Sequence, residues 1–165
     1  MRTSQKGIDF IKSFESLHDG DLKLAGLQPM MDPVGIWTEG YGRAMRDKKG
    51  AFIKGANNKA LAYSNQTIKT EKEAESALKQ DLTIYERIVD QKLKVAVNQN
   101  QFDALVSHTY NTGGSATLFD LINKKASVKD IRNWFTTKYI TAQGKTLNGL
   151  IRRRKAEADL YFQNN

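Results

Sequence analysis

The chain has 165 residues, of which 39% are hydrophobic and 27% charged, which is typical of a globular protein with one domain or two small lobes sharing a core. Cysteine is absent and there are only 2 histidines, which excludes a disulfide framework and a thiolate metal site and argues against a zinc site. The net charge of +8 favours an anionic partner such as nucleic acid, anionic lipid or an acidic cell wall, but the basic residues are scattered apart from 152–155, so we expect no nucleic acid.

The first segment predicts a helix over residues 5–17, because its apolar residues recur at helical spacing and Ser4 is placed to cap it. Glu15 falls near the C-terminal end, where the helix dipole disfavours a carboxylate; we expect it to find a cation or to keep a proton more readily. The N-terminus lacks the apolar core of a signal peptide, and no apolar run is long enough to span a membrane. We therefore expect synthesis in the cytoplasm, no stable membrane insertion and another exit route for work outside the cell.

Residues 20–56 change character, because 7 glycines separate short strand-like pieces such as 35–38 and 51–53. This pattern predicts a small antiparallel sheet with hairpins. Residues 56–69 are polar, and we expect them to be irregular.

The rest of the chain predicts helices. Thr70 and Glu73 form a capping box that opens a long helix over about 70–93. Further helices are expected from a cap at Asn98 to a stop at Gly113, over 118–125, after a cap at Ser127, and over about 150–162.

The order of these elements predicts an α+β fold with all of residues 1–165 in one domain. It comprises a sheet lobe over about 18–69, a connecting helix over about 70–93, and a helical lobe over about 94–165 packed with helix 5–17. A groove between two such lobes is a common place for a ligand.

Glu15, Asp32 and Thr38 supply the groups that hydrolysis of a glycosidic bond requires. One carboxyl protonates the leaving oxygen while a second group directs a water onto the sugar carbon. Thr38 follows Asp32 by an even offset, which puts both on one side if the chain is extended throughout. Purely structural roles stay open for all three residues. Glu15 would then be a solvated glutamate, Asp32 a turn aspartate before proline, and Thr38 an ordinary strand threonine.

Other polar and aromatic residues are less informative. Strand alternation sends Glu39 to the face opposite Thr38, which leaves it out of catalysis. We interpret His18 as a surface histidine rather than one that tunes Glu15 or pairs with a nearby aspartate. His108 is expected in the core or a polar network, and Trp37 and Trp134 in the core rather than on sugar.

Three blocks of the sequence together resemble the phage-type lysozymes, the muramidases of glycoside hydrolase family 24. The first is Glu15 with DPVGIWTEGYG at 32–42, the second is NQNQFDALVS at 98–107 with YNTGG at 110–114, and the third is LNGLIRRR at 147–154 with Glu157. They occur in the family's order and span nearly the whole chain.

The resemblance implies a lysozyme-like fold and a monomeric endolysin that needs no metal or cofactor. Its substrate would be bacterial peptidoglycan, cut with inversion at the β-1,4 bond between N-acetylmuramic acid and N-acetylglucosamine after release from the host cytoplasm. Glu15 would be the general acid, and Asp32 with Thr38 would position water. The resemblance further assigns the sugar groove to Gly42, Tyr110 and Asn111, and the partner of Glu15 to Arg153.

The sequence departs from the family pattern in three places. The 16 residues between Glu15 and Asp32 make that segment longer than usual, which leaves Asp19 and Asp21 as substitutes for Asp32. Arg43 stands where the family usually has histidine, and Glu39 replaces an aliphatic residue. Two other functions stay open: a lytic transglycosylase, and an inactive homologue that binds cell wall.

Overall fold

The structure is a computed structural model and describes residues 1–164. Helices α1 to α7, one short 3₁₀ helix and small antiparallel sheets make up this part of the chain, so the predicted α+β class is confirmed. The chain divides into two compact units. The helical unit comprises Met1–Ile11 and the chain from Leu82 onward, and the sheet unit comprises Lys12–Asp81. Their membership of one domain stays a prediction.

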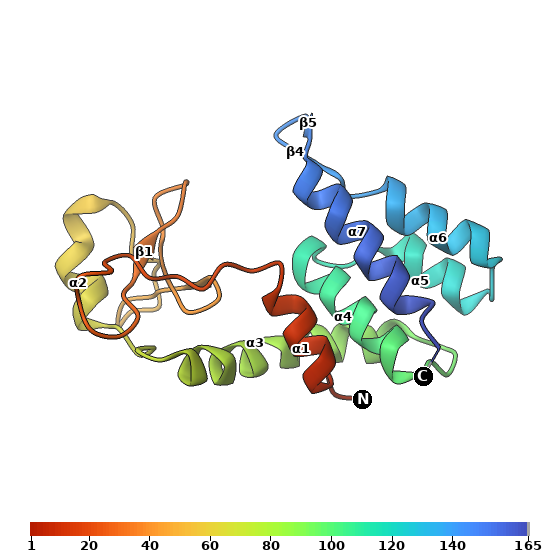
Figure 1. Cartoon of the computed structure of the whole chain (residues 1–165), viewed down its shortest axis with the longest axis horizontal. Coiled ribbons are helices and arrows are strands. Elements are labelled where there is room, and N and C mark those ends of the chain that lie inside the picture. Colours follow the sequence, from red (N-terminus) through yellow and green to blue (C-terminus); the bar gives the residue numbers. More distant parts are fainter. Residues whose placement is uncertain (165) are drawn as a thin grey trace. The chain divides into compact units, whose positions relative to one another are not determined.

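The helical unit is built around α4 (Gln99–Thr112), most of which is buried. Helix α7 (Asn148–Tyr161) packs on α4 and on α6 (Val128–Thr137), and α6 packs on α5 (Ala116–Asn123), as Figure 1 shows. A two-stranded hairpin of β4 (Thr141–Ala142) and β5 (Lys145–Thr146) precedes α7. The core of the unit includes Phe102, Leu105, Val106, Leu118, Phe119, Ile122, Ile131, Phe135, Ala158, Leu160 and Tyr161.

The ends of these helices follow local signals that the sequence carries. Asn98 accepts a hydrogen bond from the backbone of Gln101, which returns one from its own side chain, and this capping box fixes the start of α4. Gly113 ends α4 with a φ of 81°, a left-handed conformation that glycine adopts without strain. Ser127 caps α6. The predictions of these three boundaries are confirmed.

The sheet unit contains a three-stranded antiparallel sheet in the order β1 (Met30–Met31), β2 (Trp37–Glu39) and β3 (Arg43–Ala44). A short 3₁₀ helix η1 (Ala56–Asn58) and α2 (Lys59–Ser64) follow. The expectation that 56–69 is irregular was therefore wrong for 56–64, and it is confirmed for 65–69. The helix forms because Ala62, fully buried, packs in a small core with Trp37, Met45 and Ile53.

Helix α3 (Glu71–Lys92) contributes residues 71–81 to the sheet unit and 82–92 to the helical unit. Its predicted capping box is present: the Thr70 hydroxyl oxygen accepts from the backbone N–H of Glu73 at 3.2 Å, and Glu73 Oε2 accepts from the N–H of Thr70 at 3.0 Å. A further bond from the N–H of Lys69 lowers the pKa of Glu73.

Helix α1 (Gln5–Lys12) begins as predicted but ends earlier. Ser4 Oγ accepts from the N–H of Gly7 at 3.1 Å, which makes it the expected cap. The predicted extension to residue 17 was wrong, and Glu15 lies in the turn beyond the helix. Ser13 and Ser16 have low helix propensity, and a last turn carrying Glu15 would set a carboxylate against the helix dipole.

Candidate active site

The hairpin formed by β1 and β2 places Asp32 and Thr38 on one face of the sheet. Met30 pairs with Thr38, and the backbone N–H of Asp32 continues the ladder to the carbonyl of Ile36 at 2.8 Å. Directly opposite residues of an antiparallel pair share a face, and so do residues two apart on one strand. Asp32 is thus the diagonal neighbour of Thr38. Our premise of an extended chain was wrong, because a turn with Gly35 at a φ of 84° reverses its direction.

The side chain of Asp32 closes this turn with one of its two oxygens. Oδ1 accepts from the backbone N–H groups of Val34 at 2.9 Å and Ile36 at 2.8 Å. Within residues 1–164, Oδ2 has no hydrogen-bond partner. The carboxylate is therefore held in a fixed orientation while one oxygen stays available to accept from a ligand or a water.

Thr38 is 5% exposed and its hydroxyl makes two contacts. Oγ1 donates to the carbonyl of Met30 at 2.9 Å and lies 2.6 Å from Nδ1 of His18. The backbone N–H of His18 is itself bonded to the carbonyl of Gly40 at 2.8 Å. The interpretation of His18 as a surface residue was wrong. Its position shortly after Glu15 was the only signal in the sequence, and it gave no hint of Thr38.

Charge links His18 to both predicted acids. Burial lowers the pKa of His18, and the nearby carboxylates of Asp32 and Glu15 oppose that shift. Glu15 is partly buried in the turn after α1. The sheet unit thus brings the two carboxylates, the threonine and an unforeseen imidazole into one cluster, which we call the Glu15–Thr38 cluster: Glu15, His18, Asp32 and Thr38.

Glu39, next to Thr38 on β2, has a different environment. Its carboxylate is 5% exposed and accepts from the backbone N–H groups of Thr67 at 2.9 Å and Ile68 at 3.0 Å, and from the Thr67 hydroxyl at 2.7 Å. These bonds fasten the segment before α3 to β2. They use both carboxylate oxygens in holding the fold.

The neighbouring turn carries two further positions that the sequence singled out. Gly42 is exposed with a φ of 87°, and a Cβ built there would meet no atom within 4 Å. Arg43 binds Asp81 through two N–H···O contacts of 2.9 Å and also donates to the carbonyl of Ala77 at 2.6 Å. Where the family usually has histidine, this chain therefore has a residue that ties β3 to α3.

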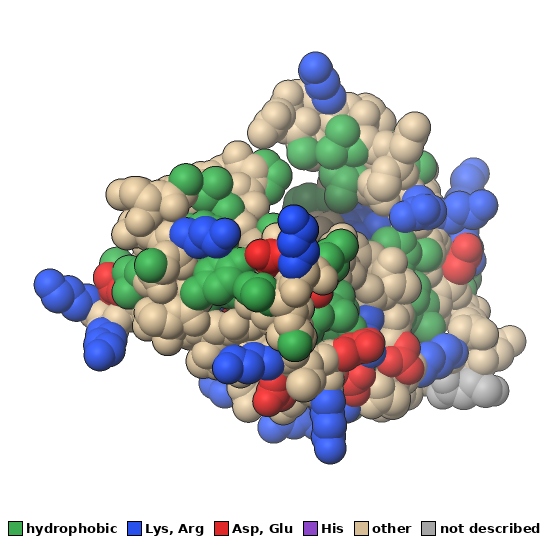
Figure 2. Space-filling view, turned by 60° about the vertical axis from the view of Figure 1, so that its left-hand side comes forward, with side chains coloured by type: hydrophobic (Ala, Val, Ile, Leu, Met, Phe, Trp, Pro, Cys, Tyr) green, Lys and Arg blue, Asp and Glu red, His purple; other side chains and the backbone are tan. Residues whose placement is uncertain are grey.

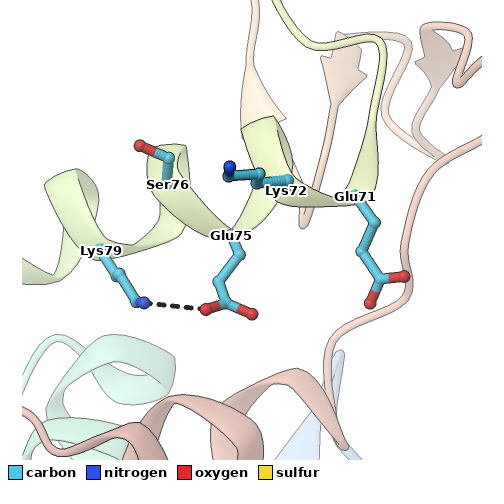
Figure 3. Close-up of a pocket in the computed structure, with 5 residues that line it drawn as sticks. All are labelled: Glu71, Lys72, Glu75, Ser76 and Lys79. Carbon is cyan, nitrogen blue, oxygen red and sulfur yellow. Dashed lines mark ion pairs between the residues drawn. The ribbon is translucent and has the colours of Figure 1, made fainter.

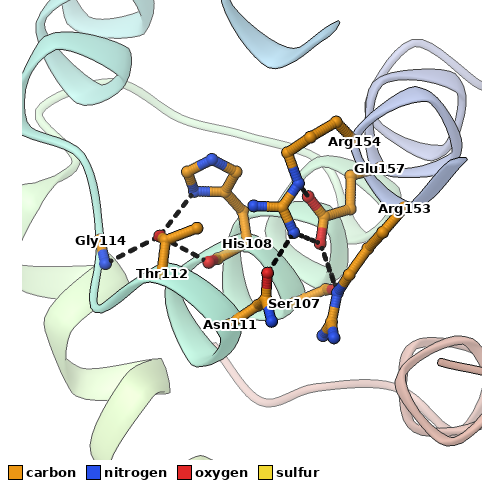
Figure 4. Close-up of polar contacts among 8 residues, drawn as sticks. All are labelled: Ser107, His108, Asn111, Thr112, Gly114, Arg153, Arg154 and Glu157. Carbon is orange, nitrogen blue, oxygen red and sulfur yellow. Dashed lines mark hydrogen bonds and ion pairs between the residues drawn. The ribbon is translucent and has the colours of Figure 1, made fainter. Parts of the chain in front are cut away.

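The remaining predicted site residues lie in the helical unit, on α4 and α7. The ring of Tyr110 packs edge-on against Tyr85, with ring centroids 5.1 Å apart. Asn111 is exposed, and its Oδ1 accepts from Nη2 of Arg154 at 2.8 Å (Figure 4). The bond uses the Oδ1 atom and fixes the orientation of the Asn111 amide. It leaves the two N–H groups of the Asn111 side chain out of this contact.

Arg153 belongs to a buried network that Figure 4 shows between α4 and α7. Glu157, fully buried, accepts from Ser107 Oγ at 2.8 Å, Arg153 Nε at 3.2 Å and Arg154 Nη2 at 3.0 Å. Burial raises the pKa of Glu157 and the two arginines oppose this. His108, which is 1% exposed, has its pKa lowered to about 3 by burial and by the same arginines. The prediction of a buried polar role for His108 is confirmed, and the pairing of Arg153 with Glu15 stays a prediction.

A pocket of about 460 Å³ lies along the first turns of α3 (Figure 3). It is lined by Glu71, Lys72, Glu75, Ser76 and Lys79. Its central carboxylate, Glu75, pairs with Lys79 at 2.8 Å and with Lys12 at 2.8 Å. None of the predicted site residues lines this pocket.

On the face shown in Figure 2, lysine and arginine side chains stand singly or in small groups among acidic and apolar ones, without a continuous basic stripe. Residues 1–164 hold no group of three His, Asp or Glu side chains arranged to bind a metal ion. None of the helices described combines the length and hydrophobicity that a membrane crossing requires.

Comparisons with known proteins identify the family to which the chain belongs. Residues 23–157 match the family model described as phage lysozyme. The endolysin of Bacillus phage B103 is 35% identical over 98% of this chain. The chain spans about half the length of the first curated relatives, and 54% of the B103 endolysin. The solved endolysin of Escherichia coli O157:H7 phage FAHEc1 is 33% identical, with a TM-score of 0.69 over 98% of this chain and 94% of that one. The muramidase domain of SpmX from Asticaccaulis excentricus is 26% identical, with a TM-score of 0.68 over 99% of both chains. The predicted lysozyme-like fold is confirmed, and the chain belongs to the phage lysozyme family.

Proposed function

We propose that the chain is a peptidoglycan hydrolase that cuts the β-1,4 bond between N-acetylmuramic acid and N-acetylglucosamine with inversion. The observation that carries the proposal is the hairpin register that makes Asp32 and Thr38 diagonal neighbours on one face. The Cα atoms of such neighbours are roughly 7–8 Å apart. Within residues 1–164 the Asp32 and Thr38 side chains make no hydrogen bond with each other, and a water molecule between them could bond to an acceptor oxygen of each.

The proposed reaction uses Glu15 as the general acid. Glu15 donates its proton to the glycosidic oxygen as the bond to the anomeric carbon breaks. A water on the opposite face gives one proton to Asp32 Oδ2 and bonds with the other to Thr38 Oγ1, and its oxygen forms the new bond to the carbon. The fixed Oδ1 of Asp32 and the buried hydroxyl of Thr38 support this assignment, because both acceptors are oriented before the substrate arrives.

The remaining predicted residues have supporting roles in this proposal. Arg153 holds the Glu15 carboxylate in its working rotamer. Gly42, Tyr110 and Asn111 line the sugar groove, where Gly42 lets the polymer approach the backbone. Asn111 donates to a sugar oxygen through the amide group that Arg154 leaves available.

We further propose that the protein acts as a monomer on the cell wall after release from the cell that makes it. The named endolysins and muramidase domain among the relatives support peptidoglycan as the partner. The net charge of +8 suits the anionic wall. The scattered lysines and arginines visible in Figure 2 favour this partner over nucleic acid.

The test is loss of turbidity of purified peptidoglycan with the wild type, Glu15→Gln and Asp32→Asn. Removing the general acid should lower the rate by about 10² to 10⁴ while leaving the unfolding temperature nearly unchanged. Lysis by Glu15→Gln at the wild-type rate would reject the assignment. Sedimentation with the wall without any loss of turbidity by the wild type would indicate an inactive wall-binding homologue.

Asp47 offers a matched control for Asp32, because it closes a second hairpin turn in the same way. Its Oδ1 accepts from the N–H groups of Lys49 at 2.8 Å and Ala51 at 2.9 Å, as Asp32 does from Val34 and Ile36. Asp47→Asn should keep full activity. If Asp32 is only a turn residue, Asp32→Asn will behave like Asp47→Asn; a loss confined to Asp32→Asn supports a role in holding water.

A further inference from the structure

We propose that His18 is a positioning residue for the attacking water, acting through the hydroxyl of Thr38; this rests on the hydrolase function proposed above. The contact of 2.6 Å between His18 Nδ1 and Thr38 Oγ1 carries the proposal. In this proposal His18 makes no direct contact with the water. Its role is to fix which way the Thr38 hydroxyl presents its hydrogen and its lone pairs.

The count of donors and acceptors at Thr38 determines the direction of each bond. A hydroxyl has one hydrogen and two lone pairs. The hydrogen of Oγ1 is directed at the carbonyl of Met30, 2.9 Å away, so the bond of 2.6 Å to His18 requires a hydrogen on Nδ1. One lone pair of Oγ1 then accepts from His18, and the other remains for a proton of the water that Asp32 also holds.

The imidazole is neutral in this arrangement. Burial lowers the pKa of His18, and this effect outweighs the charges of the Asp32 and Glu15 carboxylates, which act in the opposite direction. A neutral ring with a hydrogen on Nδ1 carries its lone pair on Nε2. It therefore orients Thr38 without setting a full positive charge beside the acid, Glu15.

The long segment between Glu15 and Asp32 holds the ring in place. The backbone N–H of His18 bonds to the carbonyl of Gly40, just after β2, at 2.8 Å. Two residues on, the N–H of Gly20 bonds to the carbonyl of Gln28 at 3.1 Å and closes the segment into a loop. A Cβ at Gly20 would lie 2.1 Å from the carbonyl oxygen of Pro29, so only glycine allows this close approach. The long segment between Glu15 and Asp32 thus forms a closed loop. The residues where this loop begins hold the His18 ring against the Thr38 hydroxyl.

The substitutions His18→Leu, His18→Asn and His18→Gln separate the two ring nitrogens. An asparagine amide N–H lies near the place of Nδ1, and a glutamine amide lies near that of Nε2. Loss of one neutral hydrogen bond predicts a decrease in kcat of about tenfold for His18→Leu, with KM changed by less than about twofold. His18→Asn should recover most of that loss and His18→Gln should not. Recovery by His18→Gln, or a kcat of His18→Leu equal to that of the wild type, would overturn the proposal.

A double-mutant cycle tests whether His18 acts through Thr38. In a Thr38→Val background, His18→Leu should cause no further decrease in kcat, because the hydroxyl that it orients is gone. Thr141→Val removes the hydroxyl of an exposed residue in the helical unit and serves as the control. In that background His18→Leu should still cause the full tenfold decrease in kcat. Multiplicative losses in the Thr38→Val background would overturn the proposal.

A spectroscopic measurement on the wild type does not depend on how the variants fold. Nitrogen NMR of the His18 side chain at pH 7 should show the hydrogen on Nδ1 and an unprotonated Nε2. A hydrogen on Nε2 alone would overturn the proposal. The hydrolase function fails separately, if the wild type lyses no peptidoglycan or if Glu15→Gln lyses it unimpaired.

Discussion

His108 should make the protein less stable in mild acid, and the size of the effect follows from its burial. Its pKa falls from the ordinary 6.5 to about 3 in the folded protein because burial and the charges of Arg154 and Arg153 disfavour the imidazolium. In the unfolded chain the ring is protonated below pH 6.5. Between pH 6.5 and about 3 the unfolded state therefore binds more protons, and the free energy of unfolding decreases as pH falls.

One pKa unit corresponds to about 1.4 kcal/mol. The free energy of unfolding therefore decreases by about 5 kcal/mol over the full range from pH 6.5 to about 3, and by about 2 kcal/mol between pH 6.5 and pH 5. His108→Phe removes this proton while keeping a ring between Phe135 and Tyr139, whose centroids lie 5.5 Å and 5.4 Å from that of His108. Few polar contacts are lost, because in the part of the chain described Nε2 has no hydrogen-bond partner and Nδ1 has a single long contact of 3.4 Å with the Thr112 hydroxyl.

Urea unfolding followed by circular dichroism at pH 7, 6 and 5 measures the difference between the two proteins. The wild type should lose about 2 kcal/mol more than His108→Phe on going from pH 7 to pH 5. The buried Glu157, whose raised pKa acts in the opposite direction, is present in both proteins and cancels in the comparison. Parallel pH profiles would refute the reasoning and would mean that a charged His108 is accommodated in the folded state.

Three further predictions concern stability and are checked by the same unfolding measurement. Gly20→Ala should destabilise the protein by about 1–3 kcal/mol, because the new Cβ would lie 2.1 Å from the carbonyl oxygen of Pro29. Gly149→Ala is the control and should be neutral or stabilising, because a Cβ there meets no atom within 4 Å. Equal effects of the two substitutions would contradict this prediction. Asn98→Ala should cost about 1 kcal/mol through loss of the α4 cap, and an unchanged midpoint would show that the cap is dispensable. Glu157→Gln should cost about 3–5 kcal/mol because it leaves two buried guanidinium groups without their carboxylate, and a cost below about 1 kcal/mol would show that the network relaxes.

The elements that could be predicted from the sequence are those that local chemistry determines. Thr70, Asn98 and Ser127 cap helices through bonds to residues three positions away, so a short stretch of sequence contains the whole signal. Helix α2 has no such pattern: its one fully buried residue, Ala62, is held by a core whose other members come from elsewhere in the sheet unit. The early end of α1 was also missed, because apolar periodicity continues past the point where the helix stops.

The same distinction applies to the site. Asp32 and Thr38 belong to one hairpin, so their spacing along the chain was enough to predict that they share a face of the sheet. The prediction of an extended chain between them was wrong. His18 and Thr38 are 20 residues apart and meet only because the intervening loop closes on itself. Arg43 finds Asp81 across 38 residues in the same way. Contacts of this kind depend on the fold of the whole unit, and no local pattern reports them.

The proposed hydrolysis depends on a water that Asp32 and Thr38 deliver to the anomeric carbon, and digestion of peptidoglycan in water enriched in oxygen-18 tests this directly. Mass spectrometry of the fragments should find the heavy oxygen on the reducing-end muramic acid of the wild-type products, and Asp32→Asn should release them at least about a hundredfold more slowly. Fragments that end in anhydro-muramic acid without the heavy oxygen would contradict the account, because the bond would then have been cut without attack by water.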